Sequence, residues 1–204
     1  MHKLSFFNFD LKNHFEKNKM QYLVLFLCFF IGVVIGIFIA NSKSSYLGLL
    51  DIKDKDLIDI INGNISIMAC FWDNFWSFCL PLLFVFLFSL NYYFSFLNLF
   101  LLGYQSVLLY LTCQATILSY EFLGVLKILL ILPINICYFI IIIFWIVSCG
   151  ERAKISFRTK RFFNGFDSSF YNKLIVSFLS VFVLSMLVGM VIPLLLKTAI
   201  FLVF

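Results

Sequence analysis

Charge is scarce in this chain. Only 12% of its 204 residues are Asp, Glu, Lys or Arg, whereas 63% are hydrophobic. A soluble domain has about 25% charged residues and is about half apolar. The polar stretches between the apolar runs are too short to fold as a separate soluble domain. We therefore predict one membrane domain, residues 21–204, preceded by a cytoplasmic amphipathic segment, residues 1–20.

Groups that carry chemistry are also rare. The only histidines, His2 and His14, precede the first apolar run, and His14 is predicted to be solvated. No ionisable residue lies well inside a predicted span, since Asp73, Glu121 and Lys127 fall at span ends. The chain has neither the HExxH pattern of metalloproteases nor the GxxxxGK[ST] loop of nucleotide-driven machines. These absences predict a protein without catalytic residues, metal or cofactor, and therefore not an enzyme.

The six cysteines show no CxxC pair and no zinc-ligand spacing. Most fall at lipid depth, where a thiol behaves as a small hydrophobic group. A Cys70–Cys79 disulfide is conceivable.

Five apolar runs are each long enough to cross a bilayer. Each must be helical, because lipid offers no hydrogen-bonding partner to an open backbone. The predicted fold class is thus an all-α, polytopic membrane protein with about five transmembrane helices and short interfacial helices. The predicted spans are residues 22–40, 75–90, 96–118, 125–149 and 174–193, with an outer loop at 41–74 and a basic inner loop at 150–173.

Lysine and arginine concentrate in two places, the N-terminal segment and the 150–173 loop. Five spans put these two segments on the same side of the membrane. The positive-inside rule makes that side cytoplasmic, so the C-terminus lies outside. Nucleic acid is not a predicted partner, because the charges form no basic stripe on an exposed face.

The segment before the first span carries Leu4, Phe7, Leu11 and Phe15 on one helical face. We predict a short interfacial helix on the inner leaflet or, alternatively, a partly ordered tail.

Small residues recur every four positions in the first span, at Gly32, Gly36 and Ala40. Such a face lets a second helix approach closely. It predicts either a seam for a second copy or a partner protein, or packing within the same chain. Ser185 and Gly189 form a weaker pair of the same kind in the fifth span.

Aromatic residues crowd the end of the outer loop, where Trp72 and Trp76 lie one turn apart around Asp73 and Asn74. We predict a helix at the outer interface that bends at Asp73–Asn74 and enters the membrane before Pro81. The tryptophans belong to an aromatic belt at the headgroups or form a docking face for an external partner.

The fourth span carries the sequence LPIN at its middle, with Pro133 and Asn135. Proline removes the hydrogen bond to the Leu129 carbonyl and strains that turn by about 3 kcal/mol. The surrounding apolar run can carry such a kink without a special function. We expect the kink to turn Asn135 toward the bundle, for a hydrogen bond to a neighbouring helix.

The order of these features resembles the stage II sporulation protein M family of integral membrane proteins. The likeness extends over roughly residues 10–197. It rests on FLCFFIGVVIGIFIANS, FWDNFW, Gly103 in LLGYQ, LPIN and the final VGMVIP. Many family members carry a Pro-His-Gly-type stretch followed by Glu in the fourth span. Here Ile134 and Asn135 follow Pro133, and no Glu follows.

The resemblance implies a non-catalytic membrane scaffold or anchor for peptidoglycan-remodelling proteins during engulfment. Its location would be the bacterial cell membrane, at the sporulation septum. Its partners would be the lipid bilayer and the stage II sporulation proteins D and P, with a homo-oligomer as a further option. The alternative is a small transporter or channel component, because broken helices often line substrate sites.

Overall fold

The computed structural model describes residues 11–42, 66–159 and 168–203, and within these ranges it contains helices and no strand. The predicted all-α class is confirmed. Five helical segments are long and apolar enough to cross a membrane, as expected for a polytopic helical membrane protein. They are Lys19–Asn41, Ile67–Phe88, Tyr92–Leu118, Gly124–Thr159 and Ser168–Thr198.

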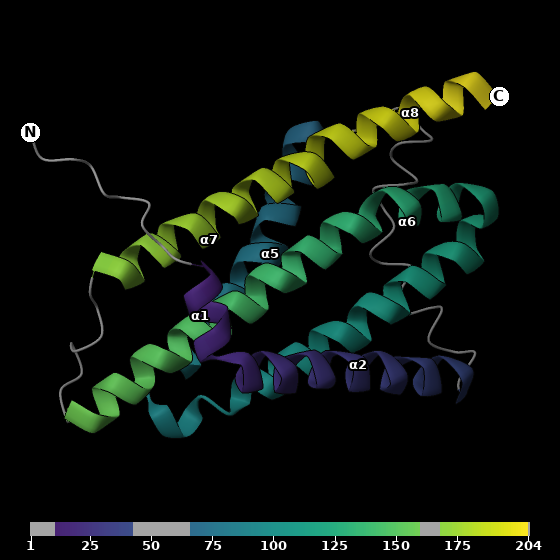
Figure 1. Cartoon of the computed structure of the whole chain (residues 1–204). Helices are drawn as coiled ribbons and strands as arrows, with labels where there is room; N and C mark the ends of the chain where they lie inside the picture. Colours follow the sequence, from purple (N-terminus) through teal and green to yellow (C-terminus); the bar gives the residue numbers. More distant parts are fainter. Residues whose placement is uncertain (1–10, 43–65, 160–167, 204) are drawn as a thin grey trace, which may run out of the picture.

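The chain order of the elements is simple (Figure 1). A short helix leads into the first span, the third and fourth spans belong to one helical element, and the fifth contains a π-helical turn. The elements are α1 (Leu11–Lys17), α2 (Lys19–Ser42), α5 (Ile67–Phe88), η2 (Tyr92–Phe94), α6 (Leu97–Thr159), α7 (Ser168–Met186), η3 (Leu187–Val191) and α8 (Ile192–Val203).

Helix α6 reverses direction between its two spans (Figure 1). We call residues 97–118 its first arm and residues 124–159 its second arm. Gly124 makes the tight reversal possible, since a Cβ there would collide with the Thr116 carbonyl and approach the Ile117 Cα to 3.1 Å. The turn lies where the sequence predicts the short outer connection.

The second arm of α6 lies at the centre of the bundle, between the first arm and α7 (Figure 1). Its Trp145 and Ile142 are only 1% exposed, and they share the core with Leu82 and Val85 of α5 and Val181 of α7. A polar atom of this core also forms a hydrogen bond between helices. The Trp145 indole donates a hydrogen bond to the Leu82 carbonyl at 3.0 Å.

Helix α2 packs its small-residue face against the first arm of α6. A Cβ at Gly32 would approach the Gly103 carbonyl oxygen to 2.6 Å and the Ser106 Cβ to 2.8 Å. At Gly36 the nearest atom would be the Tyr110 Cβ, at 3.1 Å. Of the two readings of this seam, the structure supports packing within the same chain at Gly32 and Gly36.

The second span differs from the prediction. The sequence predicts an interfacial helix with a bend at Asp73–Asn74, but α5 is one continuous helix from Ile67. Ser66 caps it by accepting a hydrogen bond from the Ala69 amide at 3.4 Å. The Asn74 side chain donates to the Cys70 carbonyl, one turn back, at 2.8 Å, so the polar residue is accommodated within the helix. Pro81 consequently lies inside α5 and not in its first turn.

The predicted inner loop at 150–173 is also largely helical. Helix α6 continues to Thr159, and α7 begins at Ser168. The helix does not end at the first charged residues after the apolar run. These residues, Glu151 and Arg152, form hydrogen bonds within the bundle. Most of the predicted outer loop, residues 43–65, lies outside the described residues, as do Leu4 and Phe7.

Candidate functional site

One end of the bundle holds a cluster of charged and polar side chains around Glu151, on the second arm of α6. We call His14, Lys17, Asn18, Glu151 and Lys173 the inner cluster. One carboxylate oxygen accepts from the Asn18 amide at 2.9 Å and lies 3.3 Å from Lys17 Nζ. The other accepts from Lys173 Nζ at 3.2 Å and lies 3.3 Å from His14 Nδ1. A single carboxylate therefore connects α1, α6 and α7.

The sequence interpretation of His14 is wrong, because this side chain is buried, with 7% of its surface exposed. Its ring packs edge-on against Phe144, with the ring centroids 5.4 Å apart. Burial lowers the pKa of His14 below its ordinary 6.5, and the positive charges of Lys173 and Lys17 lower it further, against the opposite effect of Glu151. The imidazole is therefore held neutral near pH 7.

A second polar group beside the inner cluster joins the turn after α5 to α6. Arg152 is 1% exposed, and its guanidinium donates to the Ser89 carbonyl at 2.5 Å and lies 5.9 Å from the centre of the Phe86 ring. The Asn98 amide donates to the Ser89 hydroxyl at 2.9 Å. These contacts fix the α5–α6 turn against the second arm.

These contacts test the predicted topology. The inner cluster holds the segment before the first span against the start of the fifth, and Arg152 holds the turn between the second and third spans nearby. Helix α1 thus lies at the same end of the bundle as Glu151 of α6 and Lys173 of α7, as the predicted topology requires. That this end is cytoplasmic remains a prediction from the charge distribution.

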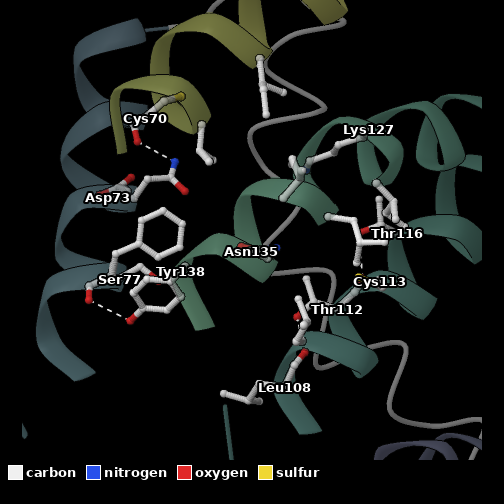
Figure 2. Close-up of a pocket in the computed structure, with 18 of the residues that line it drawn as sticks. Cys70, Asp73, Ser77, Leu108, Thr112, Cys113, Thr116, Lys127, Asn135 and Tyr138 are labelled. Atoms are coloured by element: carbon white, nitrogen blue, oxygen red, sulfur yellow. Dashed lines mark hydrogen bonds between the residues drawn. The ribbon is translucent and has the colours of Figure 1, made fainter. Parts of the chain in front are cut away.

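The opposite part of the bundle contains a cavity of about 460 Å³. We call it the outer cavity. Helix α5, both arms of α6 and the η3–α8 segment line it, as Figure 2 shows for part of the lining. Its polar lining residues are Asp73, Asn74, Ser77, Gln105, Thr112, Thr116, Lys127, Asn135 and Tyr138.

The polar residues of the outer cavity fall into two groups. Some already serve the fold: Thr112 donates to the Leu108 carbonyl at 2.7 Å, and Tyr138 donates to the Phe78 carbonyl at 2.8 Å. By contrast, the side chains of Asp73, Gln105 and Asn135 form no hydrogen bond or ion pair within the described parts of the chain. These three come from α5, the first arm and the second arm, so the fold brings them together from distant parts of the sequence.

Asn135 corrects the expectation of an interhelical hydrogen bond. Figure 2 places it between the α5 wall and the first arm of α6. It is half-buried and lines the outer cavity, but no neighbouring helix in the described structure pairs with its amide. Pro133, two residues earlier, lies inside α6 with its side chain exposed. The LPIN sequence therefore places the Asn135 side chain in the lining of the outer cavity.

The remaining sequence candidates are spread over the molecule. Asp73 and Asn74 line the outer cavity, whereas Gly32, Gly36 and Gly103 belong to the α2–α6 seam and Ala40 lies half-buried further along α2. Trp72 and Trp76 are 46% and 51% exposed on the outward side of α5. Cys70 and Cys79 form no disulfide.

Sequence reasoning missed the whole inner cluster. A signal was present, since His14 and Asn18 continue the helical spacing of the buried Tyr22 and Leu25 toward the N-terminus. Glu151 follows the buried Val147 by one turn in the same way. The apolar stripe ended before these residues, so the pattern of hydrophobicity alone stopped short of them.

Comparison with known proteins gives no match: no protein-family model, no curated protein and no solved structure matches the chain. What the fold defines is the class, a multi-pass helical membrane protein.

Proposed function

We propose that this chain is a membrane anchor for proteins that remodel peptidoglycan, as its resemblance to stage II sporulation protein M implies. Its place would be the bacterial cell membrane and, in sporulating cells, the septum during engulfment. Its partners would be the stage II sporulation proteins D and P.

The observation that carries this proposal is the use made of two charged residues on the second arm of α6, the half-buried Glu151 and the buried Arg152. Glu151 is shared by α1, α6 and α7, and Arg152 ties the α5–α6 turn to the second arm. Here they join helices to one another, which suits a bundle whose task is to hold its shape and present a surface.

The surface that we assign to the partner is the outward stripe of α5. Met68, Trp72, Trp76 and Leu80 follow one another at four-residue spacing, and each is more than two-fifths exposed. The two tryptophans are the residues that favour the headgroup level of the bilayer. They would therefore meet a partner where it emerges from the outer leaflet.

The first experiment is deletion of the gene in the sporulating organism. We expect engulfment to stop, and the D and P proteins to be lost from the complex isolated from septal membranes. Normal engulfment without the gene would contradict the anchor role.

The second experiment locates the surface. We expect the Trp72→Ala, Trp76→Ala double variant to lose co-purification of the D and P proteins. The matched control is Phe122→Ala, which removes an aromatic side chain that is 69% exposed on the outer turn of α6. Loss of the partners from the control as well, or from neither protein, would rule out this face of α5.

The second candidate function is a transporter component, and the outer cavity favours it. A cavity beside a proline-containing helix and a π-helical turn is a common setting for a substrate site. Its test is solute flux into liposomes that contain the purified protein, over a broad solute panel. Flux that Asp73→Asn abolishes would support it, and no flux of any solute would exclude it.

A further inference from the structure

The outer cavity has the size and lining of a ligand site. Pockets for small molecules measure about 300 to 1,000 Å³, with mostly apolar walls and a few polar groups that orient the ligand. This cavity measures about 460 Å³, and its apolar wall includes Phe78, Leu108 and Ile131. Its lining also carries one carboxylate, one ammonium group and several amides.

The two charges of the cavity come from different helices. Asp73 projects from α5 and Lys127 from the second arm of α6, and Figure 2 shows them on opposite sides of the cavity. A simple cation would be attracted by Asp73 and repelled by Lys127, and a simple anion would meet the reverse. A molecule that carries both charges meets an opposite charge at each wall.

Two amides of the cavity lining suit the same ligand. Asn135 and Gln105 are half-buried and form no hydrogen bond within the described residues, although each can donate two hydrogen bonds and accept two. A half-buried amide without a partner is costly unless something else satisfies it. Phosphate or carboxylate oxygens would accept from both amides.

The level of Asp73 indicates how a ligand would reach the cavity. Asp73 is an exposed lining residue, so the cavity reaches the surface at that point. It stands between Trp72 and Trp76, which favour the headgroup region. A ligand would therefore enter from the outer solution or from the outer leaflet.

We propose that the outer cavity binds a zwitterion, with its ammonium group at Asp73 and its anionic group toward Lys127 and the amides. Two sources share this chemistry, a soluble zwitterion and the headgroup of an ethanolamine phospholipid. The inference goes beyond the anchor role, because it requires neither a partner protein nor transport.

The binding test uses the full chain, purified in detergent, with O-phosphoethanolamine as the soluble probe and calorimetry as the readout. Ethylamine and ethyl phosphate serve as analogues that carry only the ammonium group or only the phosphate group. We expect phosphoethanolamine to bind at least about tenfold more tightly than either analogue, since each carries only one of the two charge-assisted contacts. The lipid arm compares protein stability in nanodiscs of phosphatidylethanolamine with phosphatidylglycerol.

Variants locate the binding in this cavity. We expect Asp73→Asn and Lys127→Gln each to weaken binding about tenfold. The matched controls are Glu16→Gln and Lys19→Gln, which neutralise exposed charges on α1 and α2 and should leave binding unchanged.

Binding of the soluble probe supports a solute site, and a stability gain in phosphatidylethanolamine alone supports a lipid site. The inference is overturned if neither arm responds, or if Asp73→Asn leaves the response intact. Flux and engulfment are measured separately, so failure of the anchor or transporter proposal does not decide this one.

Discussion

The two ends of the bundle use polar residues in opposite ways. At the inner cluster, four side chains converge on the Glu151 carboxylate, and Lys173 and His14 are nearly buried around it. In the outer cavity, Asp73, Gln105 and Asn135 come together without pairing among the described residues. Paired polar groups stabilise a fold, whereas unpaired half-buried ones cost stability unless water or a ligand pairs with them. The inner cluster therefore joins the helices of the bundle, whereas the outer cavity holds polar groups that a ligand could bind.

The largest loss of stability is expected when Glu151, the shared carboxylate of the inner cluster, is removed. We expect Glu151→Ala to lower the free energy of unfolding by about 3 to 5 kcal/mol, because it removes the carboxylate that α1 and α7 share with the second arm of α6. Thermal unfolding in detergent measures the change. Glu16→Ala, an exposed acid on α1, is the control and should be near neutral. Equal unfolding midpoints for the two variants would show that the inner cluster does not stabilise the bundle.

The next largest effect is expected at the outer turn of α6, where the backbone is tightly packed. Gly124→Ala should cost about 1 to 3 kcal/mol, because the new Cβ collides with the Thr116 carbonyl. Gly150→Ala is the matched control on the same helix, since a Cβ there has nothing within 4 Å. It should be neutral or stabilise the helix by up to about 1 kcal/mol. A tolerated Gly124→Ala would contradict the described reversal of α6.

Stability should depend on pH through His14 of the inner cluster. The folded protein lowers the pKa of His14 below 6.5, whereas the unfolded chain has the ordinary value. As the pH falls through 6.5, the unfolded state binds more protons than the folded one, so stability decreases. The measurement is the unfolding midpoint at about pH 8 and about pH 5.5. His14→Gln should reduce the loss on acidification, and an identical loss in the variant would assign it to other groups.

The smallest effect is expected at the centre of the cavity. Asn135→Leu should change the free energy of unfolding by less than about 1 kcal/mol, because its amide has no hydrogen bond in the described structure to lose. The same variant should weaken phosphoethanolamine binding. A large loss of stability would mean that Asn135 stabilises the fold. The outer cavity would then resemble the inner cluster in this respect.

Local sequence patterns predict the all-α membrane class, five helices long and apolar enough to cross a membrane, and a common side for the N-terminal segment and the 150–173 region. Each follows from local quantities, such as the length of an apolar run and the position of lysine and arginine. The helix ends do not follow from local sequence. Whether a helix ends near Glu151 or bends at Asn74 depends on the groups that these side chains contact. Glu151 finds them on α1 and α7, and Asn74 bonds to its own helix.

The roles of the polar residues depend on contacts between distant parts of the chain. Gly32 and Gly36 could have faced a second copy, and the packing against the first arm of α6 settles their role within the chain. His14 became a core residue because α1 folds onto the second arm, a contact between residues 137 positions apart that no local pattern encodes (His14 to Glu151). Asn135 reached a cavity because α6 reverses on itself and faces α5. Contacts between residues far apart in the sequence decide whether a polar side chain is paired. A paired side chain stabilises the fold, and an unpaired one can bind a ligand.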